Sequence, residues 1–141
     1  MKALASLCIA LLLFPPFALP LCAAPVTAEY VVFFSHIPAA TAEGIREGDS
    51  VTDGAGKGEA GVVTHVSLAP TLTEIYDGTQ GTLRCVREEG YLNATITVRA
   101  AVKQQNGGLS AGTLSLLRGK TVFLHLPSFC GEGLILSVSV L

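Results

Sequence analysis

Hydrophobic and polar residues alternate along most of the chain after residue 28, with the period of two that places one face of a β-strand in a core. The clearest alternation spans residues 93–102, and residues 120–126 and 134–140 follow the same pattern. The positions expected to face inward in these three runs are Ala94, Ile96, Val98, Ala100 and Val102, then Val122, Leu124 and Leu126, then Leu134, Leu136, Val138 and Val140. These runs predict three strands of a sheet that is buried on one side.

Turn-forming residues divide the rest of this region into further strands. A strand over residues 61–69, with Val62, Val66 and Leu68 inward, is expected to end at Pro70, and a separate strand is expected over residues 71–76. Residues 79–90 are polar and show no clear pattern. The inward face of the first of these strands would continue the apolar core predicted above.

Shorter elements complete the predicted fold. Strands are expected at residues 50–53 and within 109–117, and a single helical turn capped by Thr41 is expected at 41–46. About seven or eight short strands separated by turn signals predict an all-β domain over residues 29–141, either a small barrel or a sandwich.

The strand predicted over residues 28–37 is apolar on both faces. Tyr30, Val32 and Phe34 lie on one face, and Val31, Phe33 and Ile37 lie on the other. A strand of this kind is either central in its fold or covered on its second side by a partner. Tyr30, Val31 and Phe33 are therefore the candidate residues for an interface.

Residues 1–28 form an apolar segment whose one charge is Lys2. A positive residue before a long apolar run is typical of an export signal. The run is also long enough for a spanning helix, which needs about 20 residues, although Pro15, Pro16 and Pro20 would interrupt a regular helix.

Three interpretations of this segment stay open. It is a signal peptide cleaved after small residues such as Val26-Thr27-Ala28, a retained membrane anchor, or a lipid anchor at Cys22. Each of them places residues 29–141 outside the cytoplasm.

Charge and cysteine content narrow the classes of partner. The formal net charge is −2, and lysines and arginines do not cluster, which argues against nucleic acid as a partner and leaves the membrane as a partner only through the N-terminal segment. Cys85 and Cys130 lie outside the apolar segment, and in an oxidising compartment such a pair predicts a disulfide bond. Two separate buried thiols are the alternative.

Candidate chemistry is sparse. Asp49, Asp53 and Glu59 are weak candidates for a cation site, because their spacing is similar to that of a calcium-binding loop, but Val51 stands where an oxygen ligand belongs. The sequence contains no His-Glu-x-x-His, and Ser110, in the run GLSAG at 108–112, stands in a loop without a visible base. We therefore predict no catalytic residue, no cofactor and no metal.

The order of several motifs resembles a known family. Residues 41–51 read TAEGIREGDSV and are similar to the signature TAEAIKVGDKV of an uncharacterised bacterial envelope family, DUF4330. The run GVVTHV before Pro70, the run LRGK at 117–120 and the run PSF at 127–129 before Gly133 resemble further motifs of that family. The resemblance implies an N-terminal transmembrane helix followed by an extracytoplasmic domain, with no established activity, cofactor or catalytic residue.

Together these observations favour a non-catalytic interaction or assembly module of the cell envelope, whose partner is another envelope protein or a second copy of the chain. A small-ligand or cation-binding module is the alternative. A hydrolase is a further possibility if folding brings His65 and His125 together with acidic residues.

Overall fold

The computed structural model describes residues 25–54, 56 and 58–141. These residues form eight strands and one short helix: β1 (Val26–Pro38), α1 (Ala39–Ala42), β2 (Ser50–Asp53), β3 (Glu59–Asp77), β4 (Thr82–Gln105), β5 (Gly108–Ala111), β6 (Leu114–Leu116), β7 (Thr121–His125) and β8 (Cys130–Val140). The predicted all-β class is confirmed.

The predictions made for residues 1–24 lie outside the described residues. The sheet begins at Val26, three residues before the predicted domain boundary, and Ala28 is already fully buried. Within the described residues, no helix has the length and apolar character needed to cross a membrane.

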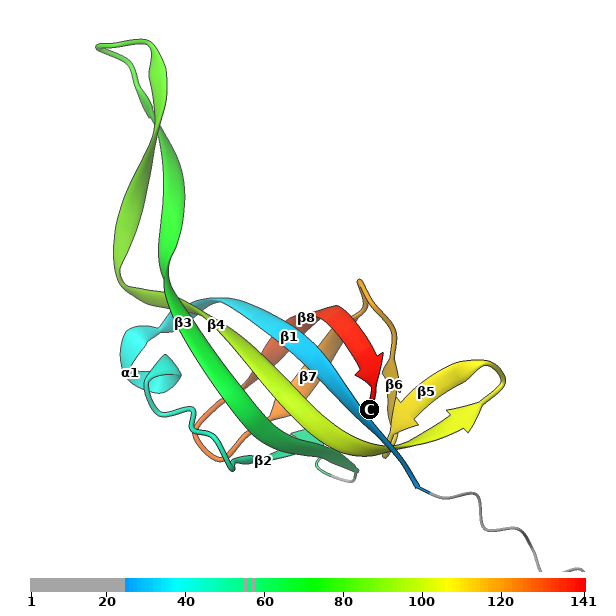
Figure 1. Cartoon of the computed structure of the whole chain (residues 1–141). Coiled ribbons are helices and arrows are strands. Elements are labelled where there is room, and N and C mark those ends of the chain that lie inside the picture. The colour runs from blue at the N-terminus through cyan, green and yellow to red at the C-terminus, as the bar shows by residue number, and fades with distance from the viewer. Residues whose placement is uncertain (1–24, 55, 57) are drawn as a thin grey trace, which may run out of the picture.

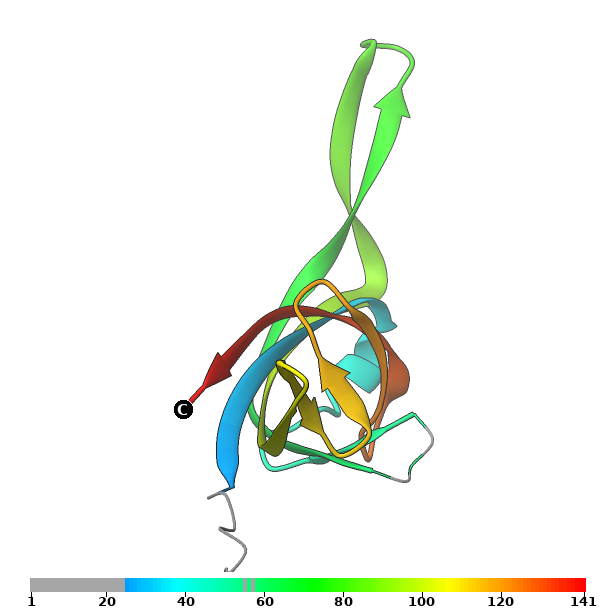
Figure 2. The ribbon, with the colours of Figure 1, turned by 90° about the vertical axis from the view of Figure 1, so that its right-hand side faces the viewer.

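The strands close into a barrel (Figure 1). β1 pairs with β8 on one side and with β4 on the other, so the antiparallel order β1-β8-β7-β2-β3-β4 returns to β1. β5 and β6 continue from the end of β4 as a hairpin, and Figure 2 shows this hairpin at one end of the barrel. The hairpin contributes three buried residues to the core: Ala111, Leu114 and Leu116.

The barrel interior is built from the alternation seen in the sequence. The predicted inward residues of the runs 93–102 and 120–126 are all buried, with exposed fractions of 5 % or less. β1 contributes Tyr30, Val32 and Phe34 from its inner face. The Tyr30 hydroxyl donates a hydrogen bond of 2.7 Å to the Ala60 carbonyl oxygen, which satisfies the one polar group that this side chain brings into the core. Burial raises the pKa of the Tyr30 phenol well above its ordinary value.

Of the inward positions predicted for residues 134–140, Val138 packs against the core, but Leu134, Leu136 and Val140 are exposed and were wrong. Ser137 pairs with Val31 but Ile135 pairs with Val32, so Leu136 is an extra residue in a β-bulge. The bulge inverts the alternation, and Ile135 is fully buried while Leu134 and Leu136 remain exposed. A pattern of period two cannot reveal one inserted residue.

Similar irregularities correct two other strands. In β3 a register shift between Val63 and His65 accompanies a buried Val63 and an exposed Val62, the reverse of the prediction. In β1 a shift between Phe34 and Ile37 turns Ile37 into the core, although alternation placed it on the outer face.

The helical turn also differs from its prediction. α1 spans Ala39–Ala42, and it follows Pro38 without a side-chain cap, so Thr41 lies inside the helix and does not cap it. Pro38 ends β1 and occupies the N-cap position with an extended ψ of 130°, where its missing N–H leaves no donor unpaired.

Two strands are far longer than predicted. Pro70 does not end a strand: β3 runs through it for 19 residues, and β4 runs for 24. Pro70 is tolerated because it lies next to a register shift, beyond the stretch of β3 that pairs with β2, so its missing N–H removes no bond to a second neighbour. The polar residues 79–90, for which the sequence showed no pattern, form the turn and the first part of β4.

Candidate interaction surface

The far ends of β3 and β4 leave the barrel as a long hairpin (Figures 1 and 2). We call residues 72–87 the arm: β3 from Leu72 to Asp77 pairs with β4 from Thr82 to Arg87, and residues 78–81 form the turn. Leu72 and Arg87 form the first pair after the register shift that follows Pro70. This shift marks where the hairpin separates from the barrel wall.

One face of the arm is largely apolar. Residues directly opposite in an antiparallel pair share a face, and successive residues alternate between faces. Leu72, Tyr76 and Leu83 therefore lie on the same face, and they are 62 %, 69 % and 69 % exposed. The other members of this apolar face are Glu74, Cys85 and Arg87.

The opposite face of the arm is organised by contacts within the chain. Arg84 Nη1 lies 3.6 Å from Asp77 Oδ2. Asp77 Oδ1 also accepts backbone hydrogen bonds from Thr79 (2.9 Å) and Gln80 (3.3 Å), which holds the turn at the tip. These contacts give the arm a defined end even though it projects into solvent.

Each strand of the arm has one unpaired edge among the described residues. From Leu72 to Asp77, β3 pairs only with β4, and β2 reaches β3 only between Glu59 and Val62. Unpaired edges and an exposed apolar face are the features through which strands associate with other chains.

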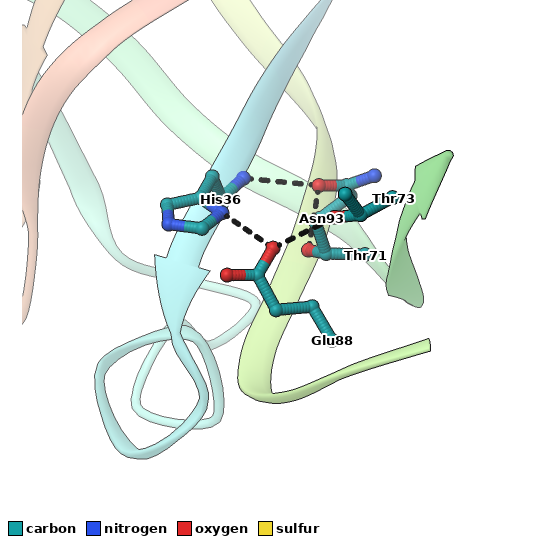
Figure 3. A network of polar contacts seen from close by, with 5 residues as sticks. All are labelled: His36, Thr71, Thr73, Glu88 and Asn93. Atoms are coloured by element: carbon teal, nitrogen blue, oxygen red, sulfur yellow. Dashed lines mark hydrogen bonds and ion pairs between the residues drawn. The ribbon is translucent and has the colours of Figure 1, made fainter. Parts of the chain in front are cut away.

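A polar network fixes the arm to the barrel (Figure 3). His36 Nδ1 lies 3.3 Å from Glu88 Oε2, and the Thr73 hydroxyl donates a hydrogen bond of 3.1 Å to the same oxygen. The His36 N–H and the Thr71 hydroxyl each donate a hydrogen bond of 3.0 Å to Asn93 Oδ1. We call these five residues the elbow network, and it connects β1, β3 and β4.

The backbone at the elbow is unusual as well. His36 has a φ of +57°, and its ring stacks on Tyr91 with the ring centroids 4.0 Å apart. A positive φ is uncommon for a residue with a side chain, although histidine adopts it more readily than most. In β4, Gly90 has a φ of +83°, which lets the strand turn from the arm into the barrel.

The elbow network is suited to positioning the arm and lacks the arrangement of a catalytic triad. The Thr73 hydroxyl donates to the Glu88 carboxylate and makes no bond to His36, so it is not activated as a nucleophile. Half of the His36 side chain is exposed. The network therefore supports the interpretation that residues of three strands hold one direction of the hairpin.

The interface candidates from the sequence lie on the barrel and not on the arm. Tyr30 points into the core and is fully buried, so it has no surface to offer a partner. Val31 and Phe33 lie on the outer wall, half-buried, and Phe33 pairs with the exposed Leu134 of β8. The outer wall is thus a second apolar surface.

The cation candidates are engaged in local turns. Asp49 Oδ2 accepts the Arg46 N–H at 2.9 Å, and Asp53 Oδ1 accepts the Gly58 N–H at 3.4 Å. Glu59 is exposed at the start of β3. In the part of the chain that the structure describes, no three or more histidine, cysteine or acidic side chains gather where they could hold a metal ion.

The two cysteines are not bonded in the structure. Cys85 and Cys130 are both free and exposed, which also differs from the alternative of buried thiols. Cys85 pairs with Glu74 in the arm, whereas Cys130 pairs with His125 in the barrel. The hairpin carries Cys85 away from the barrel, a separation that spacing along the sequence could not show.

The two histidines considered for catalysis are not brought together by any contact in the described structure. His65 Nδ1 lies 3.4 Å from Glu47 Oε1 on the surface, and both side chains are more than three-fifths exposed. His125 lies on β7, where it pairs with Thr52 of β2.

The arm is the feature that reasoning from the sequence missed. Its signal was present, because apolar residues flank the Gly-Thr-Gln-Gly turn on both sides, from Leu72 to Tyr76 and from Leu83 to Val86.

Comparison of the chain with protein-family models, curated proteins and solved structures finds no significant match.

Proposed function

We propose that this protein is an exported, non-catalytic assembly module that binds another protein chain through its arm. The observation that carries the proposal is the apolar face of the arm, where Leu72, Tyr76 and Leu83 stand exposed on a hairpin that projects from a closed barrel. Large apolar side chains exposed together are costly in water unless a partner covers them.

The stability of the hairpin supports the same function. A two-stranded ribbon is at best marginally stable in water, because it has no layer against which to bury a face. The elbow network and the Asp77 turn contacts nevertheless hold the arm in an extended form. Contacts that hold an exposed binding element in place lower the entropy lost on association.

The position of the arm agrees with attachment through the N-terminal segment. The start of β1 lies at the end of the barrel away from the arm in both views (Figures 1 and 2). If the apolar segment is the export signal or envelope anchor that its sequence indicates, the arm points away from the point of attachment.

The proposal is tested by comparing one charged substitution on each apolar surface. Leu83→Glu places a charge on the apolar face of the arm, and Phe33→Glu places the same charge on the outer wall. Complexes from cells that make the protein are cross-linked, extracted from the envelope and sized on a native gel. We expect the wild type and Phe33→Glu to migrate above the size of one chain, and Leu83→Glu to migrate as a single chain.

Thermal melting of each purified variant serves as the control for folding. Loss of the complex in Phe33→Glu alone, with its melting temperature unchanged, would move the binding surface to the wall that the sequence indicated. Complexes that survive both substitutions would contradict an assembly function for either surface.

A further inference from the structure

The apolar face of the arm carries one acid and one base that have no partner within the described chain. Glu74 and Arg87 lie on this face with Leu72, Tyr76 and Leu83. Neither side chain forms an ion pair or a hydrogen bond with another described residue. By contrast, Arg84 on the other face is matched within the chain by Asp77. Glu88, which follows the arm in β4, is matched by His36.

The register of the hairpin fixes how these groups are arranged. Leu72 lies opposite Arg87, Glu74 lies opposite Cys85, and Tyr76 lies opposite Leu83. Each strand therefore contributes one charge to the apolar face, and the two charges have opposite sign. Such a face is complementary to a copy of itself.

We propose that the partner of this face is the same face of a second copy of the chain, an inference that rests on the arm being the binding surface. With a two-fold axis running along the arms, β3 of one copy lies over β4 of the other. Tyr76 then packs against Leu83 of the second copy, and Glu74 comes beside Arg87 of the second copy. Because the contact is two-fold symmetric, each of these contacts occurs twice.

Charge selects this arrangement over its alternative. A two-fold axis running across the arms would place Glu74 against Glu74, and like charges at an interface are strongly disfavoured. The apolar side chains supply the affinity, since an unlike pair at a surface contributes little by itself, and the charges set the register. The selected arrangement makes the two arms point the same way, so both barrels lie on one side of the contact.

The test uses reversed charges in the purified full chain. Sedimentation velocity over a range of concentrations should show that the wild type forms dimers. Glu74→Arg and Arg87→Glu should each weaken the dimer at least about tenfold, because each puts two like-charged pairs into the contact. Arg118→Glu, an exposed reversal in the loop between β6 and β7, is the matched control and should leave the dimer unchanged.

Mixing the two single variants gives the decisive result. Glu74→Arg chains carry two bases on the apolar face and Arg87→Glu chains carry two acids, so the equimolar mixture should form a one-to-one dimer when neither variant does so alone. The double variant with both reversals should dimerise again. Rescue by mixing requires that the two residues meet between chains and not within one.

Two results would overturn self-association. One is a wild type that sediments as a single chain at every concentration, and the other is a dimer that is insensitive to both reversals. The size of the complex in Leu83→Glu cells separates this failure from a failure of the proposed function. If that variant loses a native complex while the purified wild type remains a single chain, the arm binds a different protein.

Discussion

The barrel and the arm use the same strands for opposite purposes. Within the barrel, β4 buries every second side chain from Ala94 to Val102, and closure through β1 leaves it with neighbours on both edges. Within the arm, the same strand exposes nearly every residue and has one neighbour. The difference shows that strand length and strand burial are separate properties, and that a strand can extend far beyond the core that stabilises it.

The two regions also use polar groups differently. In the barrel, the buried Tyr30 hydroxyl donates a single hydrogen bond to the Ala60 carbonyl oxygen inside the core. At the base of the arm, five side chains from three strands make a half-exposed network that sets the direction of the hairpin. We therefore expect substitutions in the barrel to change global stability and substitutions in the arm to change local motion or association.

The largest contrast should come from truncating one apolar residue in each region. Phe34 is 1 % exposed and its ring meets the Phe129 ring edge-on at 5.1 Å, so Phe34→Ala should lower the free energy of unfolding by about 3–5 kcal/mol. Leu83→Ala should change it by no more than about 0.5 kcal/mol, because the side chain is exposed in the single chain. Urea denaturation, at concentrations where the wild type is a single chain, measures both. Equal losses in the two variants would contradict the division of stability between the regions.

A smaller effect is expected from the buried hydroxyl. Tyr30→Phe leaves the Ala60 carbonyl oxygen without its hydrogen bond in the core and should cost about 1–2 kcal/mol of unfolding free energy. Guanidinium denaturation at neutral pH gives this value. A variant as stable as the wild type would mean that the bond contributes nothing.

The same variant has a distinct pH dependence. Burial raises the pKa of the Tyr30 phenol, so the folded protein keeps its proton at pH values where the unfolded chain loses it. The unfolded phenol titrates near pH 10, so the contribution of Tyr30 to stability is complete below about pH 10 and is lost as the pH rises above that value. Between about pH 10 and 11, the unfolding free energy of the wild type should fall more steeply than that of Tyr30→Phe.

The elbow network should affect local motion more than global stability. Asn93→Ala removes the acceptor for both the His36 N–H and the Thr71 hydroxyl. We expect faster amide hydrogen exchange in residues 72–77 and 82–87, with a loss of about 1 kcal/mol or less in global stability. Hydrogen-exchange mass spectrometry resolves the two regions. Faster exchange throughout the barrel would show that the network stabilises the whole fold.

The smallest effect is predicted for an ion pair on the outside of the barrel. Arg99 Nη2 lies 2.7 Å from Glu29 Oε1 across the β1–β4 pair, but the arginine side chain is 55 % exposed. Arg99→Gln should therefore cost no more than about 0.5 kcal/mol at physiological salt. A thermal melt at low and at high salt checks this value, and a large salt-independent loss would contradict it.

The sequence alone was enough to predict the fold class and much of the core. Where a strand has no irregularity, as over residues 94–102, alternation identified the buried side correctly. Where a bulge intervenes, as at Leu136, the same reasoning assigned the wrong residues to the core. Bulges depend on how two strands meet, and that information lies outside the strand in which they occur.

The candidate site was predicted far less well. Val31 and Phe33 were correctly placed on the face of β1 opposite Tyr30, but the apolar face of the arm was not anticipated. Pro70 suggested the end of a strand, although a proline at a bulge beside a free edge is compatible with a continuing one. Whether β3 continues through Pro70 depended on its edges: among the described strands only β4 pairs with β3 at Pro70, so the missing N–H breaks no bond to a second strand.

What the sequence determined by itself is the set of local preferences: strand-forming runs, the tight turn at Asn106-Gly107, and the number of apolar side chains available for a core. Only the tertiary structure decided which apolar residues enter the core, because each register shift changes the face that a side chain occupies. It also decided that Leu72, Tyr76 and Leu83 remain outside, since the barrel closes through the β1–β4 pair without using the far ends of β3 and β4. Closure is a property of the whole sheet, and for that reason no single run of the sequence contained it.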